Sequence, residues 1–299
     1  MAKTRKLSRK EKRETRNFYL YIMPWLISFL VLTVYPMFRS LTLCFTDSDF
    51  SGRGLFVGFK NFNTAFFTDP LFFKVFENTL WYVVLFVPAS LILSFFIGWL
   101  LSRNVRALGF FRTVFYLPYI TTGVAVIMLW GWIFNSDYGF INYLLSLAGI
   151  QGPRWLTDKN IAMVSIVIMS LWSIGNGILI MLAGIQDIPE TYYESARLDG
   201  ASTLRQVFKI TIPLCTPTIF FNLVIGTIIA FQIFSQPYIL TRGGPVDSTR
   251  TVAMYLFSNA FEYGKMGFAA TIAWCLFIVI MTITLILQAT SKKWVFYDN

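Results

Sequence analysis

The chain has 299 residues, of which 56% are hydrophobic and 13% are charged, and its formal net charge at pH 7 is +10. This composition excludes an ordinary soluble domain and predicts one polytopic membrane unit. The basic residues are spread over an N-terminal tail and short loops, so we expect no nucleic acid partner. Histidine is absent and Cys44, Cys215 and Cys275 are isolated, which argues against a metal site, a disulfide framework and the usual hydrolases.

Residues 1–16 form a basic tail with eight lysines and arginines. The apolar run that follows is too long for a signal peptide and ends without a small-residue cleavage site, so we expect a retained first helix. We expect the tail to be cytoplasmic and disordered, and to bind the anionic headgroups of membrane lipid. No internal repeat is visible, so residues 17–299 are expected to form a single transmembrane domain.

Six apolar stretches reach the length of about 20 residues that a helix needs to cross a bilayer. They cover residues 17–43, 79–101, 113–136, 161–186, 210–241 and 266–291. In the fifth stretch, kinks are predicted at Pro213, Pro217, Gly226 and Pro237. Alternate loops carry 16 lysines and arginines on one side and nine on the other, so the positive-inside rule places both termini in the cytoplasm. The predicted fold class is an all-α integral membrane protein with six transmembrane helices.

The polar loop at 187–213 is on the same predicted side and should contain two short helices. Asp187 and Glu190 have the spacing of a capping box, and Pro189 suits a first turn, so the first helix should begin there. Asp199 and Gly200 should end it, and a second helix should begin at 201–203. Helical spacing places Tyr193, Ala196, Arg197 and Gly200 on one face of the first helix. Because its small residues lie between an aromatic ring and a guanidinium, a partner surface could approach this face closely. A solvated loop without a partner is the alternative.

A pattern in this loop resembles the EAA loop of binding-protein-dependent ABC transporter permeases. The pattern is Glu194, Ser195 and Ala196, then Gly200 after three residues, then Ile210, Ile212 and Pro213 at the family's spacing. Ser195 and Ile212 are mild departures, where the family has alanine and leucine. The resemblance implies a coupling helix that docks on a separate ATPase subunit. The residues that it implicates are Tyr193, Glu194, Ser195, Ala196, Asp199, Gly200, Ile210 and Pro213.

Further segments are similar to the carbohydrate-type permeases of this family. They lie at 35–47, 57–62, 77–82, 109–119 and 240–261. The last of these resembles the maltose and glycerol-3-phosphate importers, and the chain looks more like the first of their two permease subunits than the second. It lacks the extra N-terminal spans and the large insertion of the enterobacterial maltose subunit, so contacts of those parts are not carried over.

Two clusters within the spans combine aromatic rings with amides, the pair of chemistries that binds sugars through ring stacking and hydrogen bonds. The candidate solute-binding residues are Trp172, Asn176, Phe231, Gln232 and Gln236. Counted back from residues 243–245, Phe231 and Gln232 fall where the resemblance implies an aromatic–amide pair that contacts sugar. The alternative for both clusters is helix–helix packing, because small residues and buried amides also join membrane helices.

The resemblance implies a non-catalytic permease subunit of an ABC importer in a bacterial or archaeal cytoplasmic membrane. Its partners would be a second permease subunit, two ATPase subunits, an extracytoplasmic solute-binding protein and a carbohydrate-like solute. The chain has no phosphate-binding loop, so ATP and Mg would be bound by the ATPase subunits and no cofactor by this chain. An ion-coupled secondary transporter and a membrane-bound enzyme are the alternatives. The last five spans contain no Asp, Glu, Lys or Arg, which weighs against ion coupling.

Overall fold

The structure is a computed structural model that describes residues 9–103, 107–121 and 123–296. In these residues all regular structure is helical, with one isolated β-bridge between Thr46 and Phe56. The prediction of an all-α fold is therefore confirmed. Residues 1–8 of the basic tail lie outside the described part. The expectation of disorder is wrong for residues 9–16, because the first helix already begins at Arg9.

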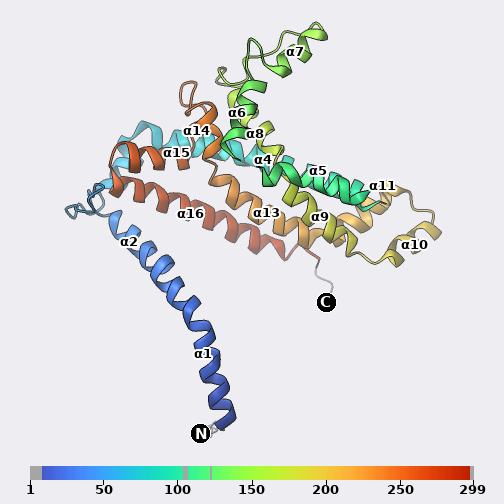
Figure 1. Cartoon of the computed structure of the whole chain (residues 1–299), viewed down its shortest axis with the longest axis horizontal. Helices are drawn as coiled ribbons and strands as arrows, with labels where there is room; N and C mark the ends of the chain where they lie inside the picture. Colours follow the sequence, from blue (N-terminus) through green and yellow to red (C-terminus); the bar gives the residue numbers. More distant parts are fainter. Residues whose placement is uncertain (1–8, 104–106, 122, 297–299) are drawn as a thin grey trace.

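The N-terminal helices form an arm that projects from the rest of the chain (Figure 1). The arm consists of α1 (Arg9–Phe29), the π-helical turn η1 (Leu30–Val34) and α2 (Tyr35–Leu43). Its stretch Arg13–Leu43 is long and apolar enough to cross a membrane, and none of its most apolar window is buried within the chain. Only the end of the arm is fastened to the body, where α2 packs against α16 (Met266–Ser291).

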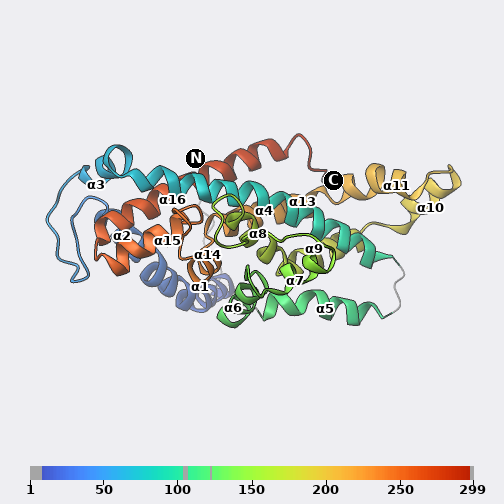
Figure 2. The ribbon, with the colours of Figure 1, turned by 90° about the horizontal axis from the view of Figure 1, so that it is seen from above.

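The long helix α4 (Pro70–Ser102) organises the body and runs along its length (Figure 2). Asp69 caps it by accepting hydrogen bonds from the backbone N–H groups of Leu71 and Phe72, at 2.8 and 3.2 Å. The proline at the first position of α4 has no backbone N–H that would need a hydrogen-bond partner. Together with the cap, it defines the start of the helix. Against α4 pack α8 (Ala162–Leu171), α9 (Gly175–Gln186), α13 (Thr216–Phe231) and α15 (Val252–Phe257).

Among the described residues, four helices are long and apolar enough to span a membrane, and six spans result if two bent pairs each count as one. These pairs are the third and fourth predicted spans. In the third, α5 (Leu108–Ile120) and α6 (Val124–Ile133) meet at 98°; in the fourth, α8 and α9 meet at 50°. The bend of the fourth brings Gly175 so close to α5 that a Cβ there would lie 2.3 Å from the carbonyl oxygen of Phe115.

The fifth predicted span is a series of pieces, in chain order η3 (Val207–Thr211), α12 (Ile212–Leu214), α13 and α14 (Ser235–Leu240). At Gly226, where a kink was predicted, α13 continues as one helix. The span breaks instead at residues 232–234, where the carbonyl oxygen of Ile233 accepts a hydrogen bond from Thr251 Oγ1 at 2.9 Å. A buried hydroxyl from the following loop thus satisfies a backbone group that the break exposes.

That following loop, residues 241–251, is fastened to α4 by hydrogen bonds. Asn78 Nδ2 donates to the backbone oxygens of Asp247 and Arg250, at 2.6 and 3.0 Å. Next to it, Thr79 Oγ1 accepts from the N–H of Val252 at 3.0 Å. Because the same loop bonds to the break in the fifth span, α14 and the N-terminal half of α4 are joined through it.

Two further loop regions complete the chain, one between α2 and α4 and one at the top of Figure 1. The first contains α3 (Lys60–Asn63) and η2 (Thr64–Thr68). Elsewhere, the turn η4 (Ser258–Glu262) directly follows α15 and precedes α16. The second carries α7 (Phe140–Leu147), which projects beyond α6 and α8.

A row of aromatic rings connects the loop of α7 with the bend of the fourth span. Neighbouring ring centroids are 5.5 Å apart from Trp155 to Phe134, 5.2 Å from Phe134 to Trp130 and 6.0 Å from Trp130 to Trp172. Phe134 is completely buried. Asn142 holds the outer end, because its Oδ1 accepts from Trp155 Nε1 at 2.7 Å.

Candidate functional site

The loop between the fourth and fifth spans contains the two predicted short helices, α10 (Glu190–Leu198) and α11 (Thr203–Gln206), which extend from the body in Figure 1. The predicted end of the first helix is confirmed. Asp199 follows its last residue, and Gly200 has φ +73°, a left-handed conformation that glycine adopts without strain. The second helix begins as predicted, with Ser202 Oγ accepting from the N–H of Arg205 at 3.4 Å.

The predicted capping box is wrong. Asp187 ends α9, and Pro189 occupies the N-cap position of α10, where its side chain makes no capping hydrogen bond. The carboxylate of Glu190 pairs with the guanidinium of Arg197 instead. The N–H of Asp187, which a capping box would offer to Glu190, already donates to the carbonyl oxygen of Ala183 at 3.0 Å, because Asp187 is the C-cap of α9.

The small face predicted to receive a partner is turned mainly toward the chain itself. Tyr193 and Arg197 line a cavity under the loop, and Ala196 is half-buried. The hydroxyl of Tyr193 lies 3.0 Å from Thr211 Oγ1, and Arg197 Nε donates to the backbone oxygen of Tyr193 at 3.2 Å. Burial raises the pKa of Tyr193, so its hydroxyl stays protonated and available for this bond.

The exposed side of the loop combines charge with apolar side chains. Glu194 and Ser195 are exposed, as are Asp199 and Gly200. Glu194 forms no ion pair with any residue that the structure describes. Leu198 is 90% exposed, and Leu204 and Phe208 are also mostly exposed. Ile210 and Pro213 are half-buried at the start of the fifth span, so they position the loop. An apolar set this exposed is typical of an interaction surface.

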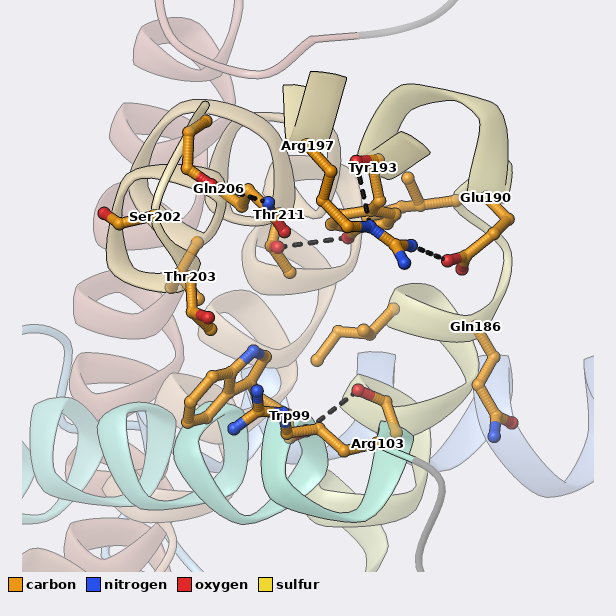
Figure 3. Close-up of a pocket in the computed structure, with 15 residues that line it drawn as sticks. Trp99, Arg103, Gln186, Glu190, Tyr193, Arg197, Ser202, Thr203, Gln206 and Thr211 are labelled. Atoms are coloured by element: carbon orange, nitrogen blue, oxygen red, sulfur yellow. Dashed lines mark hydrogen bonds and ion pairs between the residues drawn. The ribbon is translucent and has the colours of Figure 1, made fainter. Parts of the chain in front are cut away.

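A cavity of about 690 Å³ lies between this loop and the ends of α4 and α9 (Figure 3). On its α4 side, the guanidinium of Arg103 lies over the ring of Trp99, 5.1 Å from the ring centroid. On the loop side are Tyr193, Arg197, Ser202 and Thr203. We call this space the loop cavity.

A second cavity, of about 360 Å³, lies among the spans and is called the span cavity. Its walls come from α4, from the bend between α8 and α9, and from the break between α13 and α14. Three of the predicted solute-binding residues, Asn176, Gln232 and Gln236, line it. Their amides make no hydrogen bond within the described part of the chain, so all three are available to a ligand.

A smaller space of about 330 Å³ adjoins the span cavity and is lined by Trp172. The two spaces share Ser170, Ser173, Ser235 and Gln236. Trp172 is 54% exposed and occupies the bend at the end of α8. The structure thus brings an indole and three amides to adjoining spaces, which is the combination that the sequence predicts.

Phe231 is not among these residues in space. It is 2% exposed and packs in the main hydrophobic cluster with Tyr82 and Ile166, so it lines neither cavity. Gly177 lines the span cavity and is also closely packed, because a Cβ there would lie 2.9 Å from Ser94 Oγ. Conversely, the sequence analysis missed Asn222, which lines the span cavity. Its helical spacing from Gly226 and Ile229, which also line it, could have revealed it.

Comparison with known proteins places this arrangement in a family. A family model matches residues 90–296 of the chain, and the family is described as 'Binding-protein-dependent transport system inner membrane component'. The matched range includes the bend between α8 and α9, the break between α13 and α14, and the whole loop 187–213. The chain belongs to this family. As an ABC transporter permease it is a multi-pass membrane protein.

Similar permeases extend over almost the whole chain. It is 40% identical to the probable ABC transporter permease protein YesP of Bacillus subtilis, over 98% of this chain and 96% of that one. It is 33% identical to the sulfoquinovosyl glycerol transport system permease protein SmoG of Agrobacterium fabrum, over 89% and 87%. A crystal structure of a bacterial ABC transporter involved in the import of the acidic polysaccharide alginate matches with TM-score 0.80 and 25% identity, over 96% of this chain and 99% of that one.

Proposed function

We propose that this permease forms half of the transmembrane pathway of an ABC importer for a carbohydrate or a related polyhydroxylated solute. The observation that carries the proposal is the span cavity, with three unpaired amides beside an exposed indole. Related permeases named for sulfoquinovosyl glycerol, arabinooligosaccharides and lactose support the solute class.

In this proposal Trp172 stacks on the apolar face of a sugar ring while Asn176, Gln232 and Gln236 hydrogen-bond its hydroxyls. An amide without a partner inside a membrane is costly, and a polyhydroxylated solute offers each amide both donors and acceptors. Phe231 acts from outside the cavity, by packing the helix segment that places Gln232.

The exposed side of α10 and α11 supplies the contact with an ATPase subunit, through Leu198 and Leu204 with Glu194 beside them. Two such subunits bind ATP and Mg, a second permease completes the pathway, and an extracytoplasmic binding protein delivers the solute. The loop and both termini are then cytoplasmic, and the membrane is the cytoplasmic membrane of a bacterium or archaeon. Movement of the ATPase subunits rocks the spans so that access to the cavity alternates between the two sides.

The competing classes have less support. An ion-coupled secondary transporter needs ion-binding groups within its spans, and the family is that of binding-protein-dependent transporters. A membrane-bound enzyme is the other alternative. The family is that of membrane components of transport systems, and this proposal assigns catalysis to the ATPase partners.

The test is co-purification from native membranes with the chain tagged. The variant Glu194→Lys with Leu198→Glu changes the exposed side of α10 without touching the loop cavity, and Glu262→Lys is a matched control on an exposed residue outside the loop. We expect wild type and the control to recover an ATPase and a second permease, and the double variant to lose the ATPase only. Recovery of no ATPase by wild type would refute the importer assignment. Retention of the ATPase by the double variant would refute the docking surface.

A further inference from the structure

The loop cavity has walls from both sides of the junction between the spans and the loop. Trp99, Ser102 and Arg103 come from the end of α4, and Ile185 and Gln186 from the end of α9. The remaining walls come from the segment 188–211, which includes α10 and α11. A ligand in this cavity would therefore contact the span ends and the loop at the same time (Figure 3).

Among the described residues, the positive charge at this cavity is not fully compensated. The ion pairs among the described residues are Lys74–Glu77, Arg197–Glu190 and Arg250–Asp247, so Arg103 has no carboxylate partner there. Its contact with the face of Trp99 leaves the N–H groups at its edge available to an acceptor. Within the cavity, Glu190 carries the one carboxylate among the lining residues, and Arg197 neutralises it.

A second arginine, Arg112 of α5, does not line the cavity but bonds to one of its lining residues. Arg112 Nη2 donates to Gln186 Oε1 at 3.0 Å, and it forms no ion pair with a described residue. Its Nε is buried without a hydrogen-bond partner in the described part of the chain. The bond also fixes the orientation of the Gln186 amide, because the oxygen faces the arginine and the NH₂ group is left as a donor.

Hydroxyl donors line the opposite wall. Ser202 Oγ accepts from a backbone N–H and so keeps its hydrogen for another acceptor, and Thr203 lies next to it. In Figure 3 Thr203 lies across the cavity from Arg103 and Trp99. A guanidinium and a hydroxyl that face each other are both donors, and donors of this kind with a net positive charge fit an oxyanion.

We propose that the loop cavity binds a phosphate group, as a phosphate ester or as free phosphate, through Arg103 and Thr203. Arginine is suited to this ligand because its planar N–H groups match two phosphate oxygens at once. The site lies at the ends of α4 and α9, the depth at which the headgroups of phospholipids lie if these helices span the bilayer. The bound phosphate holds the loop against the span ends, so it limits how far α10 moves relative to α4.

The test uses the full chain and has two arms. In the first, the purified chain in neutral detergent is titrated with inorganic phosphate by calorimetry. In the second, the chain is placed in nanodiscs of a phosphate-free galactolipid with or without phosphatidylglycerol, and hydrogen exchange of residues 186–206 is measured. The variants are Arg103→Gln, Arg103→Lys to retain the charge, and Arg205→Gln as a control with the same charge change outside the cavity lining.

We expect saturable binding by wild type and Arg205→Gln, at least about tenfold weaker binding by Arg103→Gln, and partial recovery by Arg103→Lys. Slower exchange at 186–206 only with phosphatidylglycerol identifies a lipid headgroup as the source. Binding of inorganic phosphate without that lipid effect identifies a soluble phosphate. Absence of both effects in wild type, or equal binding by a folded Arg103→Gln variant, would overturn the proposal.

Discussion

Asn78 fastens the outer loop to α4, and Asn78→Leu tests how much of the loop's order depends on it. Leucine has a similar size but no donor, so the backbone oxygens of Asp247 and Arg250 lose their partner. A buried oxygen left unpaired costs about 1–3 kcal/mol. Asn78 is 5% exposed, whereas Asp247 and Arg250 are both half-buried, so the lower part of this range, about 1–2 kcal/mol, applies to each oxygen. The free energy of opening the loop should therefore fall by about 2–4 kcal/mol.

Hydrogen exchange of residues 241–251 measures this change. The N–H groups of Gly244 and Thr249 are hydrogen-bonded within the loop, so they exchange when it opens. At about 1.4 kcal/mol for each factor of ten, their exchange should accelerate by about 30-fold to 700-fold. Asn222→Leu is the control, because its amide donates to a carbonyl of its own helix and not to the loop. Unchanged exchange of the loop in Asn78→Leu, with α4 still protected, would refute the reasoning.

Three other changes have defined outcomes. A Cβ at Gly184 would lie 2.3 Å from a hydroxyl oxygen of α13, so Gly184→Leu should destabilise the fold by about 1–3 kcal/mol or more in thermal unfolding, whereas Gly226→Ala, with open space around it, should stabilise it by about 0.5–1 kcal/mol. Gln232→Leu should raise the solute concentration for half-maximal uptake at least about fivefold, with Gln288→Leu on the exposed side of α16 as the matched control. Tyr193→Phe should lower the unfolding free energy by about 1 kcal/mol at pH 7, because the hydrogen bond to Thr211 is lost. Since the pKa of Tyr193 is raised in the folded state, the tyrosine's contribution to stability is present below about pH 10 and is lost as the pH rises further. The variant should lack this loss of stability at alkaline pH.

Hydropathy predicted where the spans are but not how they bend. The sixth span was predicted at 266–291, and α16 has these bounds. The fourth was predicted as one helix, yet it bends by 50° near residues 172–174. The contact that accompanies this bend is between Gly175 and the backbone of Phe115, 60 residues away in the sequence. Apolar composition cannot report such a contact, because a straight and a bent helix bury the same kinds of side chain.

In the loop 187–213, features set by the local backbone were predictable and those set by side-chain competition were not. Gly200 ends α10 as expected, because few other residues adopt its backbone conformation without strain. Asp187 and Glu190 have the spacing of a capping box, but Arg197 takes the carboxylate of Glu190. The spacing rule does not register that the preceding helix α9 already uses the N–H of Asp187.

The solute-binding prediction was limited by helix phase. Neighbouring residues in a helix differ by about 100° in direction, so Phe231 at the end of α13 and Gln232 after it point to different surroundings. The break at 232–234 turns Gln232 and Gln236 to the span cavity and leaves Phe231 in the hydrophobic cluster. Their residue types were visible in the sequence, whereas the break, where Thr251 bonds to Ile233 from 18 residues away, was not.

The aromatic row from the α7 loop to the fourth span has an optical consequence. The indoles of Trp130 and Trp172 lie 6.0 Å apart with their planes at 69°. Two indoles at this distance and oblique angle couple their electronic transitions and give a circular dichroism couplet that neither gives alone. Because Trp172 also lines the space beside the span cavity, a ligand that turns its ring changes the couplet. Occupancy of the permease can therefore be followed without any attached label.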